Sequence, residues 1–202
     1  MKSLAKKWWV YPLLLLIIYS ITFPFFFRNP DYPLFFEVYS RFNGTLEHIA
    51  IDENKEQLIQ NFESVEIGAL ATDFTLADVD GNSRSLSDFK GKTVLLTFWA
   101  SWCPACRGEN KHLAEIYPEY KGKGFEIFAV SLDRSKKNWE KAIEKDGITW
   151  TQVSDLEGVD SPIATQYGVY STPTTFLINE EGIIIAKDVQ GEALDKELAD
   201  IF

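Results

Sequence analysis

The hydrophobic pattern from residue 67 onward alternates between short apolar runs and longer amphipathic stretches. Residues 93–100 read TVLLTFWA and residues 125–131 read FEIFAVS, runs typical of strands that are buried on both faces. Further strands are predicted at 73–76, 83–86, 150–153, 174–178 and 182–187, and helices at 104–120, 135–145, 162–167 and 194–201. Strands that alternate with helices and end in a hairpin and a helix predict an α/β sandwich with a mixed central sheet.

The N-terminal pattern is different, because residues 8–27 (WWVYPLLLLIIYSITFPFFF) hold no charged side chain. Twenty residues of helix rise about 30 Å, the thickness of the hydrocarbon core of a bilayer. Lys2, Lys6 and Lys7 precede this segment, and the positive-inside rule then predicts a cytoplasmic N-terminus and an extracytoplasmic body. We expect a single-pass membrane protein whose folded domain lies on the extracytoplasmic side.

A cleaved signal peptide is the alternative interpretation of the same segment. Signal peptidase needs small residues at the cleavage site, and the sequence FPFFFRNPDYP that follows offers none. A retained anchor is therefore favoured, and the sequence divides into three predicted parts. Residues 1–28 form a cytoplasmic tip and transmembrane anchor, residues 29–66 a connector with a helical stretch at 52–62, and residues 67–202 the folded domain.

The charge distribution excludes one class of partner. The chain has a formal net charge of −10, and four of its 20 basic residues (Lys2, Lys6, Lys7 and Arg28) precede the first acidic one. The rest of the chain therefore holds 16 basic and 30 acidic residues. A body this acidic repels phosphate backbones, so no nucleic acid partner is expected.

The chemistry is concentrated in Cys103-Pro104-Ala105-Cys106, which lies where a predicted buried strand ends and a helix begins. A helix N-terminus carries about half a positive charge and unpaired N–H groups, and both stabilise a thiolate. Cys103 is therefore the predicted nucleophile, with a lowered thiol pKa. Cys106 follows one turn later, within reach of a mixed disulfide at Cys103, which is the position of a resolving thiol.

Two other uses of a CxxC pair are weaker. Tetrahedral zinc needs four ligands, and beyond these two cysteines the chain offers only His48 and His112. A purely structural disulfide would close so short a loop that it would stabilise the fold little. We therefore predict a redox-active disulfide, with no metal and no cofactor.

A second feature is Pro173, which directly precedes an apolar strand in the sequence STPTTFLIN. A cis bond here would direct the backbone of Thr172 toward the cysteines and present an edge for pairing with a substrate. An ordinary trans proline that opens a strand is the other interpretation. The sequence leaves both open.

These motifs together carry a resemblance. The sequence FWASWCPAC followed some 65 residues later by STPTTFLIN resembles thioredoxin-fold proteins, and IGALATDFTLADVDGNSRSLSDFKGKTVLLTFWASWCPACRGE is similar to the membrane-anchored extracytoplasmic reductases of the TlpA/ResA kind. The resemblance covers roughly residues 66–200. It implies a thioredoxin-like three-layer sandwich with a mixed central sheet, an N-terminal hairpin and a central insertion, preceded by one transmembrane helix. The resemblance also implies a single-pass protein of the bacterial cytoplasmic membrane, with its catalytic domain on the periplasmic side.

The resemblance also implies roles for individual residues. Cys103 would be the nucleophile and Cys106 the resolving thiol, and Pro173 would be cis. Glu109 matches a glutamate that this group places near its cysteines, where a carboxylate can tune thiol pKa values and accept a proton. Trp102, Thr172 and Pro173 would bind the substrate.

The chain also departs from the family patterns. Thr97 occupies the position where thioredoxin has a buried aspartate, which argues against a general cytosolic thioredoxin. The group often has a proline at the position of Lys111, and it often reads APDF where this chain reads ATDF at residues 71–74. The helix geometry near Lys111 is therefore less well defined by the resemblance.

The leading function is reduction of extracytoplasmic protein disulfides with electrons from a membrane thiol donor, and cytochrome c maturation is one pathway served by similar proteins. A thiol peroxidase is an alternative, but the P-x-x-x-T-x-x-C arrangement of such sites needs a proline between Leu95 and Cys103, where there is none. A copper metallochaperone is another alternative, but copper carriers usually add Met or His ligands to their cysteines, and Met1 is the only methionine. Reductase, oxidase and isomerase share this scaffold, so the sequence leaves the direction of exchange open.

Overall fold

The computed structural model describes residues 65–202. The predicted membrane segment at 8–27 and the helical stretch at 52–62 lie outside these residues. Within residues 65–202, no helix is long and apolar enough to cross a membrane.

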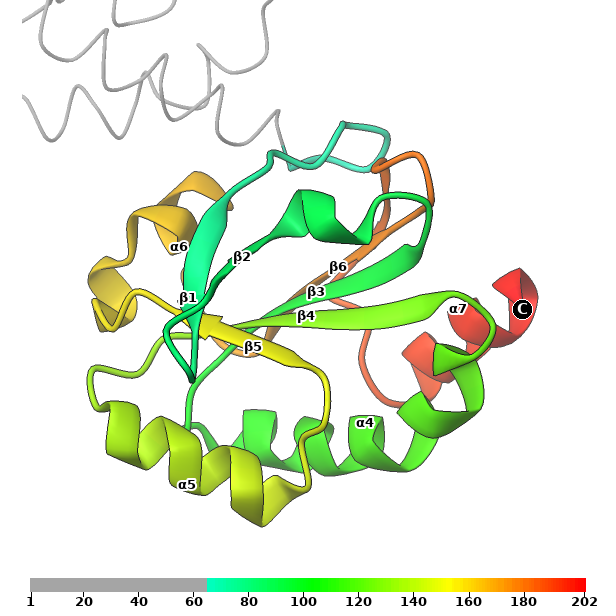
Figure 1. The fold of residues 1–202 in the computed structure, drawn as a ribbon. Helices are drawn as coiled ribbons and strands as arrows, with labels where there is room; N and C mark the ends of the chain where they lie inside the picture. Colours follow the sequence, from blue (N-terminus) through cyan, green and yellow to red (C-terminus); the bar gives the residue numbers. More distant parts are fainter. Residues whose placement is uncertain (1–64) are drawn as a thin grey trace, which may run out of the picture. The chain divides into compact units, whose positions relative to one another are not determined.

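A seven-stranded mixed sheet forms the centre of the domain (Figure 1), with the strand order β2-β1-β5-β4-β3-β6-β7. The strands are β1 (Thr75–Asp78), β2 (Ser83–Ser85), β3 (Thr93–Trp99), β4 (Phe125–Ser131), β5 (Thr151–Ser154), β6 (Thr174–Ile178) and β7 (Ile184–Lys187). The central strands β3, β4 and β5 are parallel, whereas β1 and β6 join them antiparallel. The predicted mixed sheet is confirmed, and so is the N-terminal hairpin, as β1 and β2.

The helices lie over the sheet or in the connections between strands. They are α4 (Pro104–Lys121), α5 (Lys136–Asp146), α6 (Pro162–Gln166) and α7 (Glu192–Ile201), with short 3-10 turns η1 (Leu86–Phe89) and η2 (Gly158–Asp160). In Figure 1, α4 and α5 run side by side beneath the sheet. Local signals explain the ends of α5, because the Ser135 hydroxyl caps its first turn and Gly147, at φ 68°, terminates it in the left-handed conformation.

The apolar core fills both faces of the sheet. Tyr167, which follows α6, packs its ring against Phe98 and Phe176 at centroid distances of 5.5 and 5.4 Å. Tyr117 of α4 packs against Phe125 and Trp150 at 6.2 and 5.7 Å. Burial of each such side chain contributes about 1.5–3 kcal/mol to folding, so these aromatic contacts hold the helices that carry the chemistry against the sheet.

Several element bounds differ from the sequence pattern by one or two residues; β1, for example, was expected at 73–76 and lies at Thr75–Asp78. Three of the differences have a local explanation. β5 begins at Thr151 rather than 150, because Trp150 packs on Tyr117 beside the start of the strand. β7 begins at Ile184, since the side chain of Asn179 accepts the N–H of Ile183 and extends the preceding turn. α7 begins at Glu192, two residues earlier than expected, directly after a glycine at φ 52°.

Candidate active site

The two cysteines lie at the N-terminus of α4, directly after the loop that leaves β3. They are joined by a disulfide, and both are buried, with exposed fractions of 5% for Cys103 and 1% for Cys106. Cys103 is the N-cap residue, and the backbone N–H of Cys106 donates to its Sγ at 3.2 Å. Pro104 occupies the first helical position, where its missing N–H costs no hydrogen bond. The helix therefore aims an N–H group and its dipole at the sulfur that would become a thiolate.

The loop before β6 contributes the second part of the site. The Thr172–Pro173 peptide bond is cis, which decides between the two conformations that the sequence left open. The carbonyl oxygen of Thr172 lies 3.5 Å from Sγ of Cys103. The fold thus brings Thr172 and Pro173 to the cysteines, as the resemblance implied.

Two large side chains beside these segments are exposed. Trp102, which precedes Cys103, has an exposed fraction of 60%, and Tyr170, in the loop that leads to Pro173, has one of 74%. Large apolar groups on a protein surface mark contact sites for partners when they gather near a functional group. Trp102 was predicted as a substrate-binding residue, whereas Tyr170 was missed, since an aromatic residue in a loop gives no signal before the loop is located.

Behind the cysteines, Ser101 is held by two charged residues from neighbouring elements. The carboxylate of Asp133 accepts the backbone N–H of Ser101 at 2.8 Å and its hydroxyl at 2.6 Å. Nη1 of Arg107 donates to the carbonyl oxygen of Ser101 at 3.2 Å. All three polar groups of Ser101 are therefore fixed, two residues before Cys103.

Arg107 is itself anchored by an ion pair with Asp146, at the end of α5. Both Nε and Nη2 of the guanidinium donate to the carboxylate, and the Asp146 side chain is fully buried. The hydrogen bonds that Arg107 donates to this carboxylate raise the pKa of the guanidinium, against the opposing effect of burial, so the guanidinium stays charged. Asp133 and Asp146 were missed by sequence reasoning; the available signal was the position of Asp133, two residues after a buried strand, at the edge of the sheet where the cysteines also lie.

Glu109, the predicted acid–base residue, lies on the first turns of α4 and contacts α7. Its two carboxylate oxygens accept the backbone N–H of Gly191 at 3.2 and 3.3 Å. The contact links the active-site helix to the start of the last helix. His112, further along α4, binds Asp195 of α7 through Nε2 at 2.8 Å, so both side chains reinforce the same helix pair.

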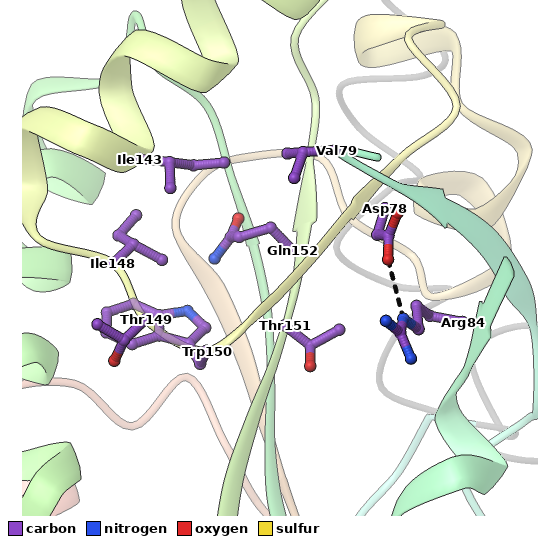
Figure 2. Close-up of a pocket in the computed structure, with 9 residues that line it drawn as sticks. All are labelled: Asp78, Val79, Arg84, Ile143, Ile148, Thr149, Trp150, Thr151 and Gln152. Atoms are coloured by element: carbon purple, nitrogen blue, oxygen red, sulfur yellow. Dashed lines mark hydrogen bonds and ion pairs between the residues drawn. The ribbon is translucent and has the colours of Figure 1, made fainter. Parts of the chain in front are cut away.

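A cavity of about 240 Å³ has a lining that includes neither cysteine; its lining side chains are drawn in Figure 2. Its lining comes from the β1–β2 hairpin, the end of α5 and the start of β5, and includes Asp78, Arg84, Ile148 and Gln152. Its link to the active site is indirect: Nε1 of Trp99, the last residue of β3, donates to Oε1 of Gln152 at 2.9 Å. The redox site therefore lies outside this cavity, at the N-terminus of α4 and beside the loop before β6. Among residues 65–202, no group of three or more His, Cys, Asp and Glu side chains is arranged to hold a metal ion.

Comparison with known proteins identifies the family. The AhpC/TSA family model matches residues 67–187. Thiol-disulfide oxidoreductase ResA of Geobacillus kaustophilus is 38% identical over 141 residues, which are 68% of this chain and 79% of that protein. ResA of Bacillus subtilis is 37% identical over 138 residues, 68% of this chain and 75% of the relative.

The chain belongs to the AhpC/TSA family and is a thiol–disulfide oxidoreductase of the ResA type. Solved structures agree with this assignment. The thioredoxin domain of a thiol-disulfide oxidoreductase from Bacteroides vulgatus superposes with a TM-score of 0.64 at 38% identity, and covers 68% of this chain and 99% of that one. A thiol-disulfide oxidoreductase from Bacteroides fragilis gives 0.62 at 39% identity, with 66% and 99% covered. The oxidoreductase therefore has the predicted thioredoxin-like α/β fold, with Cys103 and Cys106 as its CxxC pair.

Proposed function

We propose that this oxidoreductase reduces disulfides of extracytoplasmic proteins, with Cys103 as the nucleophile and Cys106 as the resolving thiol. The observation that carries the proposal is the position of Cys103 at the N-cap of α4, with an N–H group on its sulfur and the Thr172 carbonyl 3.5 Å away. In the dithiol form, the N–H and the helix dipole would stabilise a Cys103 thiolate.

The reaction consists of two exchanges. The Cys103 thiolate attacks one sulfur of the substrate disulfide, so that an enzyme–substrate mixed disulfide forms and the other substrate sulfur leaves as a thiolate. Cys106, deprotonated, then attacks Sγ of Cys103, which closes the enzyme disulfide and releases the second substrate thiolate. Two electrons have passed from the enzyme dithiol to the substrate, and the enzyme ends with the Cys103–Cys106 disulfide that the structure contains.

Substrate contact is proposed for Trp102, Thr172 and Pro173. A polypeptide that lies along the loop before β6 would find backbone groups for strand-like pairing, and the exposed indole of Trp102 would cover an apolar side chain beside the disulfide. The same loop would hold the substrate sulfur near Cys103, since the Thr172 carbonyl oxygen already lies against Sγ. Glu109 is proposed to tune the thiols and to exchange protons with them.

The cellular setting is part of the proposal. Residues 1–28 would be a cytoplasmic tip and transmembrane anchor, residues 29–66 a connector and residues 67–202 the catalytic domain on the periplasmic side. A thiol donor in the membrane would return the disulfide to the dithiol. The relatives bear the name ResA, and cytochrome c maturation is the pathway that we propose for the substrates.

The redox equilibrium of the full-length chain in detergent micelles tests the direction. The Cys103/Cys106 pair is equilibrated against dithiothreitol buffers, and the fraction of disulfide is read by thiol alkylation. We expect a potential near or below about −250 mV, as for proteins that reduce disulfides. A potential near about −120 mV would make the protein an oxidant and overturn the direction. A pair that forms no exchangeable disulfide would overturn the function itself.

A further inference from the structure

Asp133 is a buried carboxylate at the end of β4 whose hydrogen-bond donors are all neutral. Its exposed fraction is 2%. One oxygen accepts the hydroxyl of Ser101, and the other accepts the backbone N–H of Ser101 and, at 2.8 Å, the hydroxyl of Ser131. Hydrogen bonds from three neutral groups disperse the negative charge of a carboxylate, but they do not cancel it.

The other two charges of this network balance each other. Arg107 is bound through two nitrogens to Asp146, whose side chain is fully buried. This pair contributes little net charge, so the carboxylate of Asp133 leaves about one buried negative charge behind the active-site loop. Glu109, the nearest acidic residue along α4, is directed toward Gly191.

The position of this charge matters because Ser101 is two residues from Cys103. Ser101 is bound to Asp133 through both its N–H and its hydroxyl, which keeps the loop close to the carboxylate. A buried negative charge raises the free energy of a nearby thiolate, since charges interact more strongly in the protein interior than in water. The disulfide carries no charge and is unaffected. The dithiol form is therefore destabilised relative to the disulfide wherever the thiolate is populated.

We propose that Asp133 is a positioning residue that makes the Cys103/Cys106 pair more strongly reducing, because its buried charge, fixed to the loop by Ser101, disfavours the Cys103 thiolate. The inference rests on the proposed function and deepens it. It assigns the direction of exchange to a residue that touches neither cysteine. Loss of the charge would stabilise the reduced form and make the protein a weaker reductant.

The test compares wild type, Asp133→Asn and Ser101→Ala as full-length chains in detergent, equilibrated with dithiothreitol buffers between pH 6 and pH 9. Asp133→Asn keeps an oxygen that can accept a hydrogen bond from Ser101 but removes the negative charge. Ser101→Ala keeps the Asp133 charge but removes the hydroxyl that donates to it. For Asp133→Asn we expect the equilibrium to shift toward the dithiol by about tenfold at pH 9, which is about 30 mV, and by less at pH 6, where a smaller fraction of the Cys103 thiol is ionised. Ser101→Ala should show no shift in this direction.

Asp155→Asn is the matched control. Asp155 directly follows β5 and is half-buried. Like Asp133, it binds a serine hydroxyl, that of Ser161 at 2.5 Å, and a backbone N–H, that of Glu157 at 3.0 Å. Because these groups hold η2 and α6 rather than the cysteine loop, this variant should titrate as wild type. A merely structural loss in Asp133→Asn would lower the free energy of unfolding without a pH-dependent change in the redox equilibrium.

Several outcomes would overturn the inference. A redox equilibrium of Asp133→Asn within threefold of wild type at pH 9 would do so, as would an equal shift at all pH values or the same shift in Asp155→Asn. If Asp133→Asn does not fold, Ser131→Ala takes its place. This variant keeps the Asp133 carboxylate but removes one hydrogen-bond donor that disperses its charge. A shift of its redox equilibrium toward the dithiol would contradict the inference. Failure of the proposed function looks different, since the wild-type pair itself would then form no exchangeable disulfide.

Discussion

The carbonyl oxygen of Thr172 lies 3.5 Å from Sγ of Cys103, although the two residues are 69 positions apart. This contact joins the strand–helix junction that carries the disulfide to the loop that enters β6. It leaves the sulfur of Cys103 bordered by a backbone segment that a substrate polypeptide can pair with. Cys106 lies deeper, with an exposed fraction of 1%, so the two thiols are not equivalent.

This asymmetry predicts different behaviour for the two single-cysteine variants. Cys106→Ser should accumulate a mixed disulfide with a peptide disulfide substrate, because the resolving thiol is missing. Cys103→Ser should trap at least tenfold less, since the remaining thiol of Cys106 is the more deeply buried one and does not occupy the N-cap position. Mass spectrometry of the alkylated protein measures both. Equal trapping by the two variants would contradict the assignment of Cys103 as nucleophile.

The Arg107–Asp146 ion pair predicts a large loss of stability when one partner is removed. Arg107→Met leaves the fully buried Asp146 carboxylate without its cation, which typically costs about 3–5 kcal/mol. The double variant Arg107→Met, Asp146→Leu should recover most of this loss, because no unpaired charge remains. Urea unfolding measures the free energy of unfolding of the single and the double variant. Arg84→Met serves as control, since Arg84 is half-exposed in its pair with Asp78 and its loss should cost about 1 kcal/mol or less. A double variant no more stable than the single one would contradict the explanation.

Glu126 is expected to account for part of the loss of stability of the fold at acid pH. Burial opposes its ionisation, but hydrogen bonds from Lys92 at 2.8 Å and Tyr117 at 2.7 Å outweigh burial and lower the pKa of this carboxyl. A pKa that is lower in the folded state than in the unfolded state stabilises the fold above the unfolded value, about 4.3 for glutamate. That stability is lost as the pH falls through the folded value.

Glu126→Gln should therefore lose less stability than wild type between pH 5 and pH 3, although it starts from a lower value at pH 7. Urea midpoints across this range test the prediction. Glu119→Gln is the control, because Glu119 is exposed in its pair with Lys123 and should leave the pH dependence unchanged. An unchanged slope in Glu126→Gln would show that the acid transition belongs to other carboxyls.

Glu109 allows a test of its proposed tuning role that is separate from its structural contact. Gln at this position can still accept the N–H of Gly191, so the free energy of unfolding should change by less than about 1 kcal/mol. The negative charge is lost, and the midpoint of the pH–rate profile for disulfide reduction should fall by about one pH unit. Stopped-flow kinetics between pH 5 and pH 9 measures this midpoint. An unmoved midpoint with wild-type stability would limit Glu109 to the contact with α7.

The sequence by itself determined the strands, the helices and the position of the cysteines at a helix start. Short apolar runs rich in β-branched and aromatic residues favour buried strands, and residues 125–131 and 174–178 have the predicted bounds. The N-terminus of α4 follows from Pro104 and the end of the preceding apolar run. These features depend on the local period of the chain and on capping, which act within a few residues.

Only the tertiary structure decided which distant groups meet at the disulfide. The contact between Cys103 and Thr172 requires β6 to pair with β3 in one particular register, and the contact between Ser101 and Asp133 requires β3 and β4 to end at the same level. Glu109 could be assigned to a helix from sequence, but its contact with Gly191 depends on how α7 packs against α4. Such relationships arise from strand register and helix packing over the whole core, and no local pattern of side chains encodes them.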